Sequence, residues 1–236
     1  MKLHSLTAAA LLGLASASHA AIIHQYELNG NLKDAKDASP SKDLVSLGGT
    51  LGAGSYAFSA NQGLALQYAL APVYTIDMSF QLAGATASYQ RLLNWAYSAA
   101  DYGLYVYKDH FCYYRGSCLD GSVFAPNQDI RLTVTRDAAS VVTFYQNGKT
   151  LFSFQDSAGQ TLADGNRRLS FFKDDGSNEV ATGTVDFIHI YDNALSLREV
   201  QALNPGMLPE PASLGLVGAG LALVGWTRRR RERGAA

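Results

Sequence analysis

Tyrosine side chains are concentrated in one part of the chain, residues 89–115, where they offer aromatic faces for stacking and hydroxyls for hydrogen bonds. Sugar rings suit such a surface, because their C–H groups pack on an aromatic ring while polar groups fix their orientation. The alternative is that the rings fill a core, as aromatic residues of strands commonly do. The candidate ligand-binding residues are Tyr97, Tyr102, Tyr105, Tyr107, Tyr113, Tyr114 and Arg115, with Asp101 and Asp109 as polar partners.

Carboxylates are the next group that could do chemistry. Hydrolysis of a glycosidic bond needs two of them, and alternate residues of a strand share a face. Glu27, Glu179 and Glu199 are the only Glu residues between Ala21 and Leu208, and none follows that spacing. Asp174 and Asp175 adjoin Gly176 in a pattern typical of a turn. The sequence therefore predicts that the protein is not an enzyme, with a glycan hydrolase as the alternative.

Two cysteines, Cys112 and Cys118, are the only ones in the chain. In an exported protein, two cysteines so close together most simply form one disulfide. Such a bond would fix the intervening loop, in which we expect Tyr113 and Tyr114 to be the exposed pair. A free thiol nucleophile is the alternative.

Short alternating segments separated by turn residues must position these side chains. Ile130, Leu132 and Val134 alternate with polar residues, and Asn147-Gly148 between two further strands is a strong hairpin signal. A two-residue loop would place Phe144 opposite Leu151, and Tyr145 opposite Thr150. The predicted strands are residues 21–28, 63–68, 74–82, 103–108, 130–135, 141–146, 149–154 and 182–191.

One short helix is predicted after the last strand. Ser196 followed by Glu199 has the spacing of a capping box, and Leu195 and Val200 lie where a hydrophobic staple would. The helix should end near Leu203. Many strands and one late helix indicate an all-β fold, an antiparallel β-sandwich or jelly roll.

Both ends of the chain carry targeting patterns. Lys2, an apolar stretch and small residues before Ala20 predict a signal peptide over residues 1–20, cut after Ala20 or, as a second choice, Ala17. At the other end, a Pro-rich linker (204–211) precedes an apolar run (212–227) and a basic tail (228–236). The run is short for a bilayer span, and the arginines would stay on the cytoplasmic side.

This order of parts resembles the PEP-CTERM sorting signal of exported Gram-negative proteins, with Pro209, Glu210 and Pro211 as the tripeptide. Leu208 stands where the family usually has Val, and Glu232 interrupts the basic cluster. The resemblance implies an exosortase-type partner, transient anchoring of the tail in the inner membrane as a transmembrane helix, and a final place at the cell surface or outside the cell. An ordinary tail anchor is the alternative.

The segment between the two signals is acidic, with 13 Lys and Arg against 18 Asp and Glu from Ala21 to Leu208. This balance disfavours nucleic acid as a partner.

Residues 21–203 resemble the concanavalin A-like, laminin-G-like sandwich family. Three stretches carry the likeness: residues 26–34, the hairpin region 132–154, and 185–199, where a strand runs into a short helix opening in Leu-Ser. The resemblance implies a lectin-like, non-catalytic surface protein in contact with extracellular polysaccharide, with a structural scaffold that lacks a glycan ligand as the alternative. It also suggests Ca²⁺, for which Glu27, Asp34 and Asp186 are candidate ligands; the alternative is that they are solvated surface residues.

Overall fold

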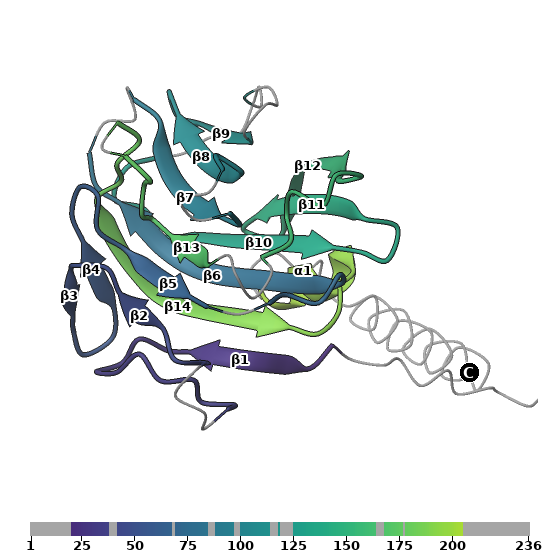
Figure 1. Ribbon diagram of the computed structural model, residues 1–236, viewed down its shortest axis with the longest axis horizontal. Coiled ribbons are helices and arrows are strands. Elements are labelled where there is room, and N and C mark those ends of the chain that lie inside the picture. Colours follow the sequence, from purple (N-terminus) through teal and green to yellow (C-terminus); the bar gives the residue numbers. More distant parts are fainter. Residues whose placement is uncertain are drawn as a thin grey trace, which may run out of the picture.

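The computed structural model describes residues 20–37, 42–67, 69–84, 88–96, 100–113, 118, 125–163, 168–176 and 178–204 of the 236-residue chain. These residues form two antiparallel sheets packed face to face, with one short helix beside them (Figure 1). The predicted all-β sandwich is thus confirmed, whereas the hydrophobic tail lies outside the described residues. Within the described part of the chain, no helix has the length and apolar character needed to cross a membrane.

The larger sheet has eight strands, ordered β12-β11-β10-β6-β14-β4-β3, and β1 pairs with the second half of β14. Its long members, β6 and β10, align Ile76 with Val134 and Met78 with Leu132. All four side chains are fully buried, because the alternation seen in the sequence turns one face of each strand inward. The strands are β1 (Ile22–Tyr26), β3 (Thr50–Leu51), β4 (Tyr56–Phe58), β6 (Tyr74–Leu82), β10 (Ile130–Arg136), β11 (Val141–Gln146), β12 (Lys149–Gln155) and β14 (Gly183–Tyr191).

The smaller sheet has six strands, ordered β2-β5-β13-β7-β8-β9. In Figure 1 it covers one face of the larger sheet, and the core lies between the two layers. Its strands are β2 (Val45–Ser46), β5 (Leu64–Leu66), β7 (Gln90–Asn94), β8 (Gly103–Tyr107), β9 (His110–Tyr113) and β13 (Leu169–Phe171).

The Asn147-Gly148 hairpin joins β11 to β12 as predicted, and both loop residues have positive φ, 49° and 80°. This conformation matches the twist of the flanking strands. Tyr145 pairs with Thr150, but Phe144 pairs with Phe152 and not with Leu151. The predicted register is therefore wrong beyond Tyr145, because a bulge between Phe144 and Tyr145 shifts the pairing by one residue.

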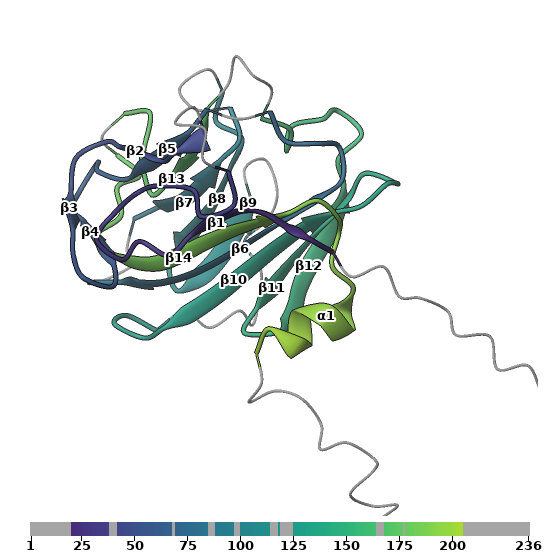
Figure 2. The ribbon, with the colours of Figure 1, turned by 90° about the horizontal axis from the view of Figure 1, so that it is seen from below.

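Helix α1 (Leu197–Ala202) begins with the predicted capping box, in which Ser196 and Glu199 exchange side-chain and backbone hydrogen bonds. Seen from below in Figure 2, it lies beside β11 and β12 on the larger sheet. Val200 is buried there with Leu195, Tyr145 and Tyr191 in a small second core.

Two hydrogen bonds tie the residue before β1 to the residue after β14. The Ala21 amide donates to the Asp192 side chain over 2.9 Å, and the Asp192 amide donates to the Ala21 carbonyl over 3.1 Å. The chain is thereby fixed at the residue that leads into β1.

Cys112 and Cys118 form the predicted disulfide. It ties the end of β9 to the loop that follows. Because the closed ring is short, the chain-entropy gain falls below the roughly 3 kcal/mol expected of a 15-residue loop. The bond fixes local structure more than it stabilises the whole fold.

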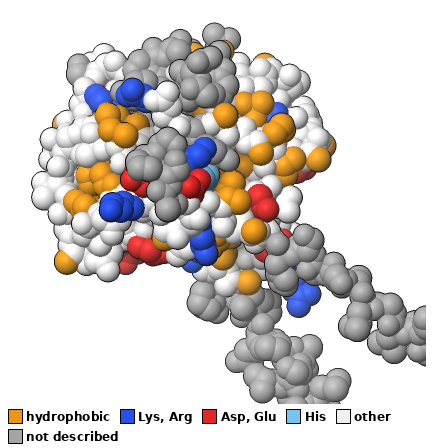
Figure 3. Space-filling model, turned by 60° about the horizontal axis from the view of Figure 1, so that its bottom comes forward, with side chains coloured by type: hydrophobic (Ala, Val, Ile, Leu, Met, Phe, Trp, Pro, Cys, Tyr) orange, Lys and Arg blue, Asp and Glu red, His pale blue; other side chains and the backbone are white. Residues whose placement is uncertain are grey.

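Figure 3 shows the face of the molecule that lies lowest in Figure 1. Acidic and basic side chains of the described residues are dispersed over this face, with hydrophobic ones between them. The charges therefore do not gather into a stripe of one sign on this side.

Candidate functional site

The strand predicted for residues 103–108 is present as β8, and one of its faces is aromatic. Leu104 and Val106 are fully buried in the core, while Tyr105 and Tyr107 belong to the opposite face of the strand. Tyr105 is 3% exposed and Tyr107 is half-buried. The outer side of the smaller sheet therefore carries a tyrosine pair.

Tyr89 extends this pair into solvent. Its ring lies 4.1 Å from the Tyr107 ring at an interplanar angle of 9°, and 5.9 Å from the Tyr105 ring edge-on. Tyr89 is 40% exposed, and the Lys108 ammonium lies 5.1 Å from the Tyr107 ring. We call Tyr89, Tyr105 and Tyr107 the tyrosine stack.

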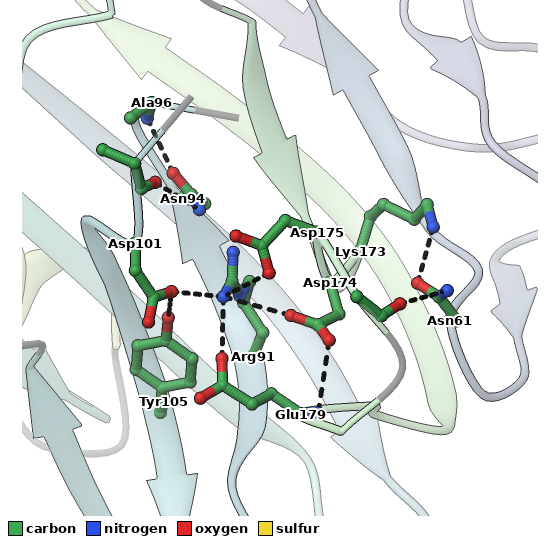
Figure 4. A network of polar contacts seen from close by, with 12 residues as sticks. Asn61, Arg91, Asn94, Ala96, Asp101, Tyr105, Lys173, Asp174, Asp175 and Glu179 are labelled. Atoms are coloured by element: carbon green, nitrogen blue, oxygen red, sulfur yellow. Dashed lines mark hydrogen bonds and ion pairs between the residues drawn. The ribbon is translucent and has the colours of Figure 1, made fainter. Parts of the chain in front are cut away.

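A buried arginine lies next to the tyrosine stack and gathers four carboxylates. Arg91 Nη2 lies 2.7 Å from Glu179 Oε2, 3.0 Å from Asp174 Oδ1 and 3.2 Å from Asp175 Oδ1, and it also donates to Asp101 (Figure 4). The Arg91 side chain is 1% exposed. We call these five residues the Arg91 cluster.

Three elements position the Arg91 cluster. Arg91 lies on β7, opposite Tyr105 of β8, where a bulge interrupts the register. Asp101 comes from the β7–β8 connection, whereas Asp174 and Glu179 come from the β13–β14 connection. The main-chain amide of Arg91 also donates to the Glu179 carbonyl over 3.0 Å. Arg91 thus holds the β7–β8 and β13–β14 connections against the smaller sheet.

The tyrosine stack and the Arg91 cluster share a member. The Tyr105 hydroxyl donates to Asp101, and the Arg91 guanidinium lies 5.1 Å from the centre of the Tyr105 ring. Burial and the hydrogen bond to Asp101 raise the pKa of Tyr105 far above its ordinary value, so the hydroxyl stays protonated and a donor. Tyr105 therefore links the tyrosine stack to the Asp101 carboxylate of the Arg91 cluster.

The charges of the Arg91 cluster are unbalanced, since one guanidinium faces four carboxylates. Burial alone would raise the pKa of Asp174, but the Arg91 charge and the Glu179 amide outweigh it, so this pKa is lowered. For Asp175, burial together with Asp174 and Asp101 exceeds the effect of Arg91, so its pKa is raised. Of these two neighbouring acids, Asp175 therefore takes up a proton before Asp174 on acidification.

Among the described residues, Asp101, Asp175 and Glu179 bring their carboxylate oxygens within 4.8 Å of one another. Oxygens this close together could in principle bind one metal ion. The fit to Ca²⁺ is poor, however, because Ca²⁺ needs six to eight oxygens and the Arg91 guanidinium already lies among these three.

The carboxylates predicted for calcium have separate partners. Glu27 accepts from His189 over 2.9 Å, Asp34 is buried 2.5 Å from His24 Nδ1, and Asp186 accepts from Ser79 over 3.0 Å. The described structure does not bring Glu27, Asp34 and Asp186 together as one group of metal ligands.

Other predicted binding residues differ in exposure. Tyr102 is half-buried, whereas Tyr113 is only 7% exposed and stacks on Phe154 with ring centres 4.4 Å apart. The expected exposure of Tyr113 is therefore wrong, because β9 turns its ring onto the aromatic core. Tyr97, Tyr114 and Arg115 lie outside the described residues.

The sequence interpretation missed the Arg91 cluster and the exposed ring of Tyr89. In the sequence, Asp174 and Asp175 fit the pattern of a turn, and Glu179 does not follow the strand spacing of a catalytic pair. A signal was available, since Arg91 stands inside the otherwise uncharged strand segment Gln90–Asn94. A buried arginine in a strand must be paired, which would have directed attention to nearby acids.

The chain is similar to a known protein family and to solved structures of the same fold. Residues 73–201 match the Laminin_G_3 family, described as the concanavalin A-like lectin/glucanases superfamily. None of the curated proteins is significantly similar to the chain in sequence.

Solved structures of the same fold include a Trypanosoma rangeli sialidase in complex with sialic acid, at 14% identity and a TM-score of 0.61. The match covers 78% of this chain and 32% of the sialidase. Domain 4 of a GH43 arabinanase from Geobacillus stearothermophilus, in complex with arabinotriose, has 15% identity and a TM-score of 0.56, with 78% and 98% covered. The botulinum neurotoxin serotype D binding domain has 12% identity and a TM-score of 0.57, with 78% and 50% covered.

These structures correct the prediction that the protein is not an enzyme. The sialidase and the arabinanase are enzymes whose structures contain this fold, so the fold is shared by enzymes and non-enzymes. At such low identity the likeness concerns the fold alone. The lack of paired carboxylates on one predicted strand did not justify excluding catalysis, because the fold gathers acids from separate connections, as the Arg91 cluster demonstrates.

Proposed function

The chain belongs to the concanavalin A-like lectin/glucanases superfamily, and we propose that its sandwich binds an extracellular polysaccharide at the tyrosine stack. The observation that carries the proposal is the exposed ring of Tyr89, held parallel to Tyr107 at 4.1 Å. A ring fixed in this way offers a flat apolar surface at little cost in side-chain entropy. Glycan ligands named in the structures of similar fold agree with this choice of ligand class.

The Arg91 cluster would supply the polar part of the same site. The Asp101 and Asp175 side chains are 32% and 34% exposed, so their carboxylates can accept hydrogen bonds from sugar hydroxyls. Since carboxylates outnumber cations here, the site would favour a neutral or amine-bearing sugar over an acidic one. Arg91 acts as a positioning residue that holds these acids beside the rings.

Removal of the two outer rings tests this site. We expect the double variant Tyr89→Ala, Tyr107→Ala to weaken polysaccharide binding about tenfold, because stacked aromatic contacts contribute about 0.5–1.5 kcal/mol each. Binding of the purified protein to a panel of bacterial and plant polysaccharides, with calcium and with a chelator, would measure the effect.

Phe187→Ala is the matched control, since Phe187 is a half-buried ring that stacks on His189 on the larger sheet. Equal binding by the double variant and the parent protein would refute the site. Failure of the parent protein to bind any member of the panel would favour the alternative, a structural scaffold of the cell surface or biofilm without a specific glycan ligand.

We further propose that the protein is exported and processed at both ends. The disulfide between Cys112 and Cys118 supports export, because such bonds persist in oxidising compartments. On this proposal residues 1–20 are a signal peptide, and an exosortase-type enzyme cuts near Pro209-Glu210-Pro211 after the apolar run has anchored the chain transiently in the inner membrane. The product would reach the cell surface or the medium.

Mass spectrometry of the protein from its own host tests this route. We expect a chain that begins at Ala21 and lacks the apolar run, because both signals would be removed. A variant with Pro209→Ala and Pro211→Ala should keep the run and stay in the membrane fraction. Recovery of the parent protein with both terminal segments intact would contradict the proposal.

A further inference from the structure

A hollow lies on the larger sheet, away from the tyrosine stack. It has a volume of about 320 Å³ and opens over the ends of β4, β14 and β6. This volume is at the small end of the range of roughly 300–1,000 Å³ that ligand pockets occupy. The hollow is therefore large enough for a short ligand segment.

The floor of the hollow follows from strand register. Thr184 pairs with Ala57 on one side and with Gln81 on the other, so these three side chains form a row across the strands. Their neighbours Phe58, Leu82 and Val185 are buried, which turns the row outward. Two residues further along, the exposed Ser59, Thr182 and Ala83 form a second row, and the Ala83 amide donates to the Thr182 carbonyl over 2.7 Å.

The polar groups of the hollow are held in place by their own contacts. Gln81 Nε2 donates to Asp129 over 2.6 Å, which fixes the carboxamide. Asn127 has a φ of 58°, and its main-chain amide donates to the Leu82 carbonyl over 2.8 Å, which fixes the backbone of this lining residue. Gly183 permits the close approach of β14 to β6, because a Cβ there would lie 2.0 Å from the Gln81 carbonyl oxygen. The lining is thus built before any ligand arrives.

The chemistry of the lining selects the ligand class. Three hydroxyls and two carboxamides can each donate and accept, while Ala57 and Ala83 offer small apolar contacts. None of the described lining residues is charged, and the charge beside them, on Asp129, is negative, so an acidic ligand would find no counter-charge. A sugar with free hydroxyls has the same mixture of donors, acceptors and C–H faces.

We propose that this hollow is a second saccharide site, which takes a neutral, hydroxyl-rich sugar segment. It uses different residues and a different sheet from the tyrosine stack, so it stands whether or not that site binds glycan. Where both sites bind, one protein molecule would join two polysaccharide strands.

Filling the hollow tests the proposal. Neutral oligosaccharides of glucose and of xylose, titrated into the full-length protein, should shift the amide resonances of Gln81, Thr182 and Thr184. Ala57→Trp should weaken this binding at least tenfold, because the indole would occupy the floor. Thr150→Trp is the matched control, since Thr150 is exposed on β12, away from the hollow, and this variant should bind as the parent does.

A second variant, Thr182→Ala with Asn127→Ala, removes two polar groups without adding volume and should also weaken binding, which covers the case in which Ala57→Trp does not fold. The proposal would be overturned if millimolar oligosaccharide left these amide resonances unshifted, or if both hollow variants bound as tightly as the parent protein. If the double variant Tyr89→Ala, Tyr107→Ala shows the same oligosaccharide-induced shifts as the parent protein, the hollow binds independently of the tyrosine stack.

Discussion

Arg91→Met should lower the free energy of unfolding by about 3–5 kcal/mol at neutral pH, as expected when one partner of a buried ion pair is removed. The Arg91 side chain is 1% exposed and Asp174 is 3% exposed, so the acid would be left in the protein interior without a cation. Asp101, Asp175 and Glu179 would then repel one another and Asp174. Urea unfolding followed by fluorescence would give the change in stability.

The loss should depend on pH, and its sign follows from proton binding. In the parent protein, the lowered pKa of Asp174 stabilises the fold at pH values above the ordinary pKa of Asp. This contribution is lost as the pH falls through the folded-state pKa of Asp174. In Arg91→Met the same carboxyls would have folded-state pKa values above the ordinary value, so acid would favour the folded variant. The difference between the two proteins should therefore shrink as the pH falls from neutral towards about 4.

Arg198→Met is the control, because Arg198 is an exposed residue of α1, and exposed substitutions change stability by only about 0.5 kcal/mol. Arg91→Lys should recover only part of the stability, because an ammonium group cannot reproduce the planar guanidinium. A loss for Arg91→Met that is the same at neutral and at acidic pH would show that lost packing, and not charge, is responsible.

Phe144→Ala should cost a similar amount, about 3–5 kcal/mol, because it removes a large fully buried ring. Phe144 is the centre of an aromatic group between the sheets, with ring centres 4.5 Å from Phe152, 6.1 Å from Tyr113 and 6.4 Å from Trp95. Its partners come from β12, from β9 and from the end of β7. Deleting the ring would leave a cavity where the two layers meet.

Phe152→Ala is the comparison, because Phe152 stacks on the same ring but is only half-buried, so its loss should be clearly smaller. Unfolding midpoints in urea would rank the two variants. Equal costs would show that the aromatic group is loosely packed around Phe144.

Local patterns predicted much of the sandwich. Alternation in β6 and β10, the Asn147-Gly148 turn and the Ser196–Glu199 capping box all act over a few residues, and each appears in the structure. The register beyond Tyr145 failed, since the bulge there changes the pairing from Leu151 to Phe152 without a clear signal in the sequence.

The candidate site was harder to predict because its parts are far apart in the chain. Arg91 meets Asp175 and Glu179 across 84 and 88 positions, and only strand order determines that distance in space. The tyrosine region was found by composition alone, but composition did not distinguish the exposed Tyr89 from the buried Tyr113. That distinction depends on which face of each strand meets the core.

The contact between Ala21 and Asp192 has a consequence for maturation. Cleavage after Ala20, as we propose, would turn the Ala21 amide into an ammonium group, with a pKa near 8, at the place where the amide now lies 2.9 Å from the Asp192 carboxylate. A hydrogen bond of the precursor would become an ion pair of the mature protein, although an exposed pair contributes only about 0–1 kcal/mol. Cleavage after Ala17 would leave the Ala21 amide uncharged. The two cleavage products would therefore differ in whether an ion pair with Asp192 forms next to β1.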